Sequence, residues 1–134
     1  MNPKNNMPQA IAQWHAYVQS RKVAHLADLL DENCTFQSPV VFTPQQGRAI
    51  TTQYLAAAMH VLGNASFVYK REWYAEGSAV LEFESTIDGV LVNGVDIVTW
   101  NGANQITDFK VMVRPLKAVN KLHELMARTL MKGA

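Results

Sequence analysis

One acid stands in the most apolar stretch of the chain. Asp96 interrupts an otherwise apolar run at residues 95–98, where burying a carboxylate is costly without a purpose. In an apolar pocket such an acid stays at least partly neutral and can donate a hydrogen bond or a proton. The structural alternative is that Asp96 pairs with Arg71 or Arg114, or that it lies on the exposed face of its strand. The residues by themselves leave both interpretations open.

Two further acids, Glu82 and Glu84, lie two positions apart and so share one face of a predicted strand. A pair of carboxylates at this spacing could carry out acid–base chemistry. Leu81, Phe83 and Ser85 form the other face of the strand, and that face is the apolar one. The alternation therefore predicts that both glutamates point to solvent or to a partner subunit.

The other residue types that often do chemistry form no recognisable site. His15, His25, His60 and His123 lie in predicted helices, and none stands at metal-ligand spacing from a second histidine, a cysteine or a carboxylate. The single cysteine, Cys34, is more typical of a small buried hydrophobe than of a nucleophile. The sequence has neither a glycine-rich phosphate loop nor a Gly-x-Ser-x-Gly motif. We therefore expect no metal and no cofactor.

The composition is that of one folded, nearly uncharged domain. Of 134 residues, 49% are hydrophobic and 17% charged, and 12 basic against 11 acidic side chains give a formal charge of +1. Because these charges are interspersed, we expect neither nucleic acid nor a membrane as partner. No apolar run has the length of a membrane span, residues 1–6 lack the apolar segment of a secretory signal, and the lone thiol suits a reducing compartment. We predict one cytoplasmic domain over residues 1–134.

The hydrophobic pattern changes along the chain from helical spacing to a twofold repeat, which predicts an α+β fold. The second half is rich in β-branched and aromatic residues and is divided by the turn signals at 76–78, 88–89 and 101–102. Polar residues 31–33 are expected to end the second helix. Expected helices cover residues 8–20, 23–30, 50–62 and the segment after Pro115, and expected strands cover 34–38, 66–75, 79–87, 90–100 and 105–114.

The four long strands predict a strongly curved antiparallel sheet wrapped round the N-terminal helices, with a closing C-terminal helix. Each strand has roughly ten residues, which is long enough for the twist to curl the sheet. Three short helices cannot fill the concave face of such a sheet completely. We therefore expect an apolar cavity there.

Three segments carry a resemblance to a known family: residues 29–39, Gly47 at the start of the third helix, and residues 94–102 running into 106–109. With them the chain resembles the nuclear-transport-factor-2-like superfamily, in particular its SnoaL-like and ketosteroid-isomerase-like branches. The resemblance covers nearly the whole chain and implies a cone-shaped α+β barrel. Its motifs are specific for the fold and weak for activity, because this superfold hosts many functions.

The resemblance also implies where relatives place their working groups. Steroid isomerases have a general-base Asp at the position of Ser38, which is too weakly basic for that role. Their helix-one Tyr, an oxyanion donor, corresponds to Trp14, whose indole N–H can still donate. Their second donor, an Asp, is kept as Asp96. Polyketide cyclases and limonene-epoxide-hydrolase-like members place a catalytic Asp where this chain has Val111.

The same resemblance implies which face of the sheet is concave. The outer face, with Met112, Val95 and Ile97, usually packs in a dimer, so we expect a homodimer. Asp96 is the expected catalytic residue if there is one. The expected ligand-binding residues are Trp14, Ser38, Tyr54, Leu81, Phe83, Ser85, Val98, Phe109, Val111 and Val113.

Three hypotheses for function follow. The favoured one is a pocket for a small, mostly apolar molecule that is oriented by Asp96, with Trp14 and Ser38 as further polar groups. The second is an isomerase, lyase or cyclase that uses Asp96 as acid or base on a hydrophobic carbonyl compound. The third is a dimeric interaction module without a ligand.

Overall fold

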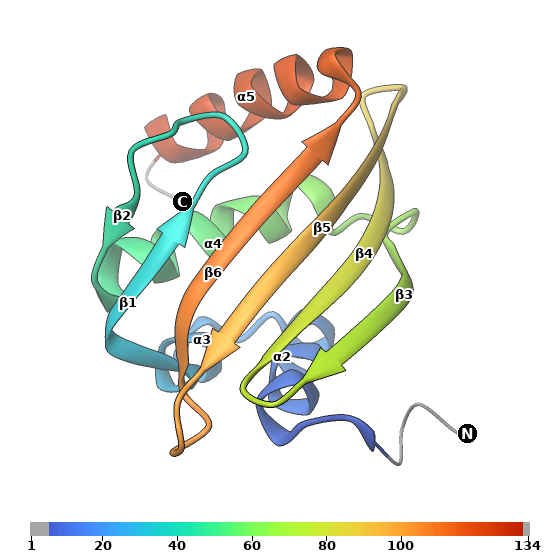
Figure 1. Ribbon diagram of the computed structural model, residues 1–134. Coiled ribbons are helices and arrows are strands. Elements are labelled where there is room, and N and C mark those ends of the chain that lie inside the picture. Colours follow the sequence, from blue (N-terminus) through green and yellow to red (C-terminus); the bar gives the residue numbers. More distant parts are fainter. Residues whose placement is uncertain (1–5, 133–134) are drawn as a thin grey trace.

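A curved sheet with helices packed against one of its faces makes up the protein (Figure 1). The structure is a computed structural model and describes residues 6–132. The ends of the expected domain, 1–134, therefore lie outside the described residues, as does nearly all of the polar N-terminal segment. Within residues 6–132, no helix is long and apolar enough to cross a membrane.

The helices follow the predicted spacing of apolar residues closely. They are α2 (Gln9–Ser20), α3 (Val23–Leu29), α4 (Arg48–Leu62) and α5 (Leu116–Met131). Helix α4 begins two residues before its predicted start, directly after Gly47, whose φ of 105° favours glycine. Helix α5 begins after Pro115, as expected for a residue that fits the start of a helix and not its interior.

The strands form a six-stranded sheet in the order β2-β1-β6-β5-β4-β3. The fold class is confirmed, and the four long strands pair as an antiparallel meander. The sheet is mixed, because β1 runs parallel to β6. Among the described residues it is not closed into a barrel, since β2 and β3 are its edges. The bounds are β1 (Leu30–Gln37), β2 (Gln45–Gln46), β3 (Val68–Ala75), β4 (Ser78–Ile87), β5 (Val90–Trp100) and β6 (Ile106–Arg114).

The prediction that polar residues 31–33 end the second helix was wrong. Helix α3 stops at Leu29, and β1 already begins at Leu30. The register explains the polar run: Leu30 pairs with Ile106 and Thr35 pairs with Asp108, so the intervening residues bulge out of the ladder. A bulge lets polar side chains occur inside a strand without entering the core.

The β4–β5 hairpin has the tight turn that its sequence predicts. Asp88 and Gly89 both have positive φ, 50° and 78°, which is the requirement of a type I′ turn. Ile87 pairs with Val90 across this turn, and the two-residue loop fixes the register along both strands. In this register Asp96 pairs with Leu81, so the two side chains lie on the same face of the sheet.

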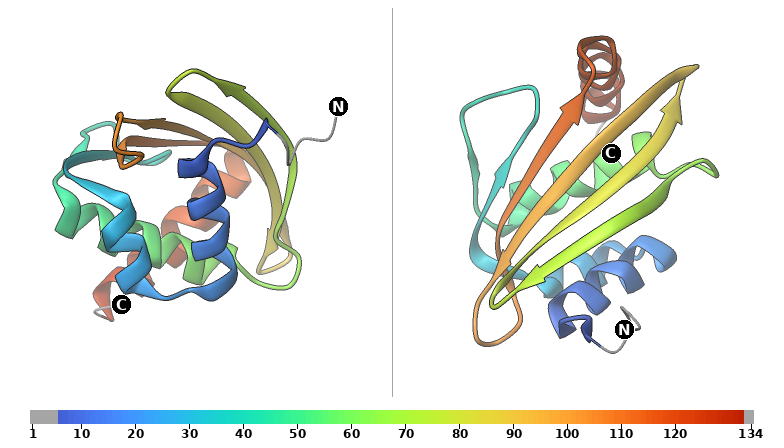
Figure 2. Two further views of the ribbon diagram at one scale, coloured as in Figure 1. Left: turned by 90° about the horizontal axis from the view of Figure 1, so that it is seen from below. Right: turned by 45° about the vertical axis from the view of Figure 1, so that its right-hand side comes forward.

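The helices cover the concave face of the sheet (Figure 2). The inward side chains of β4, β5 and β6 are mostly buried, with Val113 half-buried, while Met112 on the other face is 55% exposed, so the predicted assignment of faces is confirmed. Helix α5 lies across one end of the sheet, and α2 and α3 lie near the other (Figure 1). The most deeply buried large side chains are Trp14, Phe83 and Phe109.

Candidate functional site

A cavity of about 200 Å³ lies between the concave face of the sheet and helices α4 and α5. Its walls are almost entirely apolar. The exposed lining residues Val41, His123 and Ala127 mark its mouth, between the loop after β1 and helix α5. The lining residues are Phe36, Phe83, Asp96, Phe109 and Val111 from the sheet, Trp14, Tyr54, Leu55, Ala58, Met59, Leu62, Leu122, His123, Met126, Ala127 and Leu130 from helices, and Ser38, Pro39, Val40, Val41 and Phe67 from loops.

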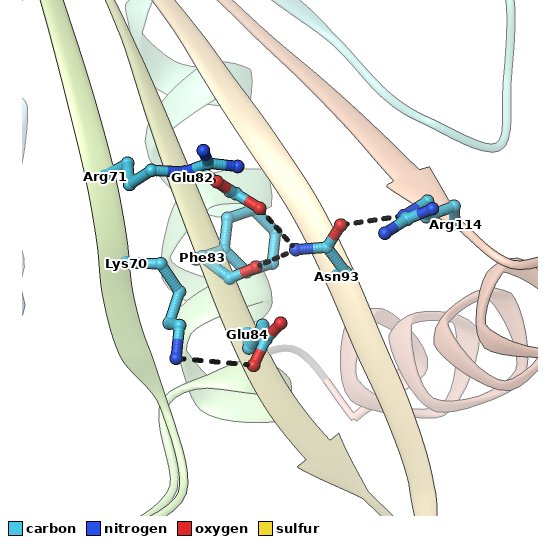
Figure 3. Close-up of polar contacts among 7 residues, drawn as sticks. All are labelled: Lys70, Arg71, Glu82, Phe83, Glu84, Asn93 and Arg114. Carbon is cyan, nitrogen blue, oxygen red and sulfur yellow. Dashed lines mark hydrogen bonds and ion pairs between the residues drawn. The ribbon is translucent and has the colours of Figure 1, made fainter.

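Asp96 projects from the inner face of β5 into this cavity and is only 5% exposed. The structural alternative, a pairing with Arg71 or Arg114, is excluded by the geometry. Arg71 Nε lies 2.8 Å from Glu82 Oε1, and Arg114 Nε donates to Asn93 Oδ1 at 2.8 Å, both on the outer face (Figure 3). Asp96 is therefore an acid of the pocket and has no arginine partner.

The carboxylate of Asp96 accepts a hydrogen bond at the end of a chain of donors. The hydroxyl of Tyr69 donates to Asp96 Oδ2 at 2.7 Å, and the indole N–H of Trp14 donates to Tyr69 Oη at 2.8 Å. The hypothesis that the Trp14 N–H serves a ligand is therefore not supported, because Tyr69 already accepts it. Trp14 lines the cavity with its ring and holds Tyr69 in place.

Burial dominates the electrostatics of Asp96 and raises the pKa of its carboxyl from 3.8 to about 7. The hydrogen bond from Tyr69 and the charge of His15 lower this pKa, but burial outweighs both. Burial and the neighbouring Asp96 raise the pKa of Tyr69 well above its usual value, so Tyr69 stays protonated and remains a donor. Asp96 can thus exchange a proton near neutral pH, as acid–base chemistry requires.

A contact between a histidine and a glutamate lies next to Tyr69. His15 Nε2 is 2.7 Å from Glu72 Oε2, and the ring of His15 meets the ring of Tyr69 edge-on at 4.9 Å between centroids. Burial alone would raise the pKa of Glu72, but hydrogen bonds from His15 and Tyr74 outweigh it and the pKa is lowered. The charge of Glu72 in turn raises the pKa of Asp96, so the two acids are coupled.

The structure brings most of the predicted site residues together. Asp96, Trp14, Ser38, Tyr54, Phe83, Phe109 and Val111 line the cavity, whereas Leu81, Ser85, Val98 and Val113 do not. Leu81 and Val98 are fully buried in packed core. The hydroxyl of Ser85 donates to the carbonyl of Leu62 at 2.7 Å and so ties β4 to the end of α4. Val113 is half-buried and packs against the core.

Two parts of the site were missing from the sequence prediction. The first is Tyr69: a register shift in β3 between Tyr69 and Arg71 breaks the strict alternation, so Tyr69 faces inward and Arg71 outward. The second is the wall from α5. The spacing of Leu122, Met126 and Leu130 at every fourth residue was a signal for a common face, although it does not say what that face meets.

Within residues 6–132, no group of three or more histidine, cysteine and acidic side chains could hold a metal ion. The arrangement as a whole is a mostly apolar cavity with one buried acid, Asp96, in its lining.

Comparison with known proteins identifies the fold. A steroid delta-isomerase from Pseudomonas aeruginosa has a TM-score of 0.86 and 30% identity, over 92% of this chain and 90% of that chain. An uncharacterised protein with a cystatin-like fold from Silicibacter pomeroyi has a TM-score of 0.86 and 28% identity, over 93% of this chain and 87% of that chain. A protein described as a SnoaL-like polyketide cyclase, from Shewanella putrefaciens, has a TM-score of 0.67 and 12% identity, over 90% of each chain.

No family model and no curated protein matches the sequence. The solved structures nevertheless agree with one another and with the observed sheet. The chain belongs to the nuclear-transport-factor-2-like superfamily, and its 30% identity is to a steroid delta-isomerase. Its likeness to the SnoaL-like protein, at 12% identity, is a likeness of fold. The resemblance inferred from the sequence is thereby confirmed for the fold.

Proposed function

We propose that the cavity binds a small, mostly apolar molecule whose one polar group forms a hydrogen bond with Asp96. The observation that carries this proposal is a buried acid in the lining of a mostly apolar cavity that opens to solvent. Ser38 supports the mouth, because its hydroxyl oxygen accepts hydrogen bonds from the N–H groups of Val40 and Val41 at 3.0 and 3.4 Å.

Filling the cavity tests the proposal without touching its polar groups. Ala58 lines the cavity from α4, and Ala58→Leu adds a bulky side chain there. We expect wild-type protein to bind a neutral fluorescent apolar probe and Ala58→Leu to bind it at least tenfold more weakly, because the added atoms occupy the same space. Ala12→Leu, on an exposed position of α2, is the matched control and should bind the probe like wild type.

The result that overturns the proposal is equally direct. If Ala58→Leu stays folded by circular dichroism and binds the probe as tightly as wild type, the probe does not enter this cavity. Mass spectrometry of small molecules that are released from gently purified protein gives a second test, because a bound natural ligand should be depleted in Ala58→Leu and retained in Ala12→Leu.

A second candidate function is catalysis, in which Asp96 acts as acid or base on a hydrophobic carbonyl compound. Two observations favour it: a pKa of about 7 for Asp96, and 30% identity to a protein described as a steroid delta-isomerase. Ser38 supplies no basic group at the mouth, so Asp96 would have to carry the proton transfer alone. Turnover of a β,γ-unsaturated ketone to its conjugated isomer, lost in Asp96→Asn, is the result that would support this candidate.

We also propose that the protein forms a homodimer through the outer face of the sheet, and that it works in the cytoplasm. Trp73, Leu91 and Met112 support the dimer, since each is between 50 and 56% exposed on that face. Cys34, a buried free thiol, fits a reducing compartment.

A further inference from the structure

Asp96 is a buried acid without a positively charged partner. Lys70, Arg71 and Arg114 of the neighbouring strands project from the outer face of the sheet and have partners there (Figure 3). Lys110 on β6 pairs in register with Ile97, whose side chain also points outward. Arg71 pairs with Glu82, and Arg114 donates a hydrogen bond to Asn93. Lys70 Nζ lies 3.9 Å from Glu84 Oε1. The sheet therefore supplies no counter-charge to the concave side.

The walls of the cavity supply none either. Among residues 6–132, no lysine or arginine lines it, and His123 stands at its exposed mouth, on α5. His15 is near Tyr69 but is paired with Glu72. A buried carboxylate in such surroundings must either keep its proton or receive a positive charge from elsewhere.

The hydrogen bonds around Asp96 point to the second possibility. Trp14 donates to Tyr69, and Tyr69 donates to Asp96, so both dipoles direct their positive ends toward the carboxyl group. Donors that are directed at a carboxylate favour its ionised form. The hydrogen bonds thus stabilise ionised Asp96, but no positively charged side chain of the cavity or the sheet pairs with it.

Aromatic rings flank the same point of the sheet. Phe83 pairs across the strands with Gly94, and Phe109 pairs with Val98, which places one ring on each side of Asp96 along the inner face. Both rings line the cavity, together with the ring of Trp14. Aromatic rings attract ammonium groups, and the attraction is stronger where water is excluded.

We propose that the polar group of the ligand is a protonated amine, which pairs with Asp96 between Phe83 and Phe109 while the apolar body of the ligand lies against α4 and α5. This inference rests on the proposed function, since it names the chemical class of the molecule held in that cavity. It differs from the carbonyl alternative in the protonation state that it requires: an amine needs Asp96 ionised, and a carbonyl needs it protonated.

Two probes of the same shape separate these alternatives. N,N-dimethylcyclohexylamine and 1-cyclohexylethanone differ mainly in the amine and the carbonyl, and the amine stays protonated throughout the range from about pH 5.5 to about pH 8.5. Isothermal titration calorimetry with the 134-residue protein gives the affinity of each. We expect the amine to bind at least tenfold more tightly than the ketone at about pH 8, because Asp96 is then ionised.

The direction in which the affinity for the amine changes with pH is a second test. Below the pKa of Asp96, each further pH unit should weaken amine binding by up to tenfold, since the ionised fraction of the carboxyl falls tenfold. Other titratable groups face the same region: Tyr69 and Glu72 from β3, His15 from α2, Tyr54 from α4 and His123 from α5. Asp96→Asn removes the contribution of Asp96 alone, so the difference between the two proteins isolates it.

Asp96→Asn should weaken amine binding at least tenfold at about pH 8 and leave ketone binding within about threefold, because an amide keeps a hydrogen-bonding group but no charge. Glu76→Gln removes one negative charge in the exposed β3–β4 turn and should leave both affinities unchanged. If the ketone binds more tightly than the amine and gains affinity as the pH falls, the amine inference is wrong and the proposed cavity function stands. If neither probe binds to folded protein, the proposed function fails and the inference fails with it.

Discussion

At the scale of single residues, the environment of Asp96 is a balance between burial and hydrogen bonding. Burial raises its pKa to about 7, although the hydroxyl of Tyr69 donates to it from 2.7 Å. A single neutral donor cannot replace the hydration that a carboxylate loses in an apolar cavity. The consequence is a group whose charge changes near neutral pH.

This pKa predicts a specific effect of pH on stability. The unfolded chain loses the Asp96 proton near pH 3.8, whereas the folded protein holds it up to about pH 7. Between these values the folded state binds more protons than the unfolded state, so the contribution of Asp96 to stability falls as the pH rises, by up to about 1.4 kcal/mol per pH unit. Above pH about 7 this loss is complete.

Asp96→Asn removes the effect, because the amide does not titrate and its oxygen can still accept from Tyr69. We therefore expect Asp96→Asn to be more stable than wild type at about pH 8, with a difference that shrinks toward about pH 4. Urea denaturation of both proteins at a series of pH values measures it. A difference that does not change with pH would mean that Asp96 titrates normally in the folded state.

At the scale of elements, the β4–β5 hairpin decides where the site residues lie. Its type I′ turn fixes a register in which Phe83 pairs with Gly94 and Leu81 with Asp96. Position 94 accommodates only glycine, because the ring of Phe83 occupies the space that a side chain would need. A Cβ there would lie 2.5 Å from Cζ of Phe83 and 2.7 Å from the carbonyl oxygen of Met112.

Gly94→Ala should therefore disturb both packing and binding. The new methyl group must displace the ring of Phe83, which lines the cavity, and we expect a loss of about 1–3 kcal/mol in the free energy of unfolding. Binding of the apolar probe should weaken in the same variant. Gly102→Ala is the control, because a Cβ at Gly102 meets nothing within 4 Å, and its urea midpoint should stay close to that of wild type.

Those elements were predictable from sequence because their signals are local. The Asp88-Gly89 turn, the alternation along β4 and the helical spacing in α5 each lie within about a dozen residues. The parallel pairing of β1 with β6 joins segments some 70 residues apart, and nothing in either segment specifies it. The register shift that turns Tyr69 inward lies in the pairing of β3 with β4 and has no local sequence signal, so the partner of Asp96 was missed although Asp96 itself was found.

At the scale of the whole molecule, the two faces of the curved sheet differ: the concave face lines the cavity, and the outer face carries exposed apolar side chains. The concave face, α4 and α5 enclose the cavity, and not every inward residue reaches it: Leu81 and Val98 lie in packed core, whereas Phe83 and Phe109 line the cavity. Sequence alternation assigned residues to the correct face, but the distance of each from the helices depends on the tertiary packing.

The outer face combines charges that are paired within the chain with apolar side chains that are exposed. The exposed apolar side chains lead to the prediction of a dimer. The ion pair of Arg71 with Glu82 is satisfied within one chain, whereas Leu91 and Met112 are more than half exposed, at 56 and 55%. Solvent-exposed apolar side chains on a sheet are stabilised by burial against a partner, and a second copy of the same face is self-complementary in a twofold dimer.

A charge at the centre of this face should separate the subunits. Met112→Glu places two carboxylates in the proposed interface, and we expect sedimentation equilibrium at micromolar concentration to give a dimer for wild type and a monomer for this variant. Leu116→Glu introduces the same charge at the start of α5, where the side chain is 74% exposed, and should remain dimeric. Because Met112 points away from the cavity, monomeric Met112→Glu should still bind the apolar probe. A wild-type protein that sediments as a monomer would rule out the dimer and leave the cavity proposal intact, since the two faces of the sheet are tested separately.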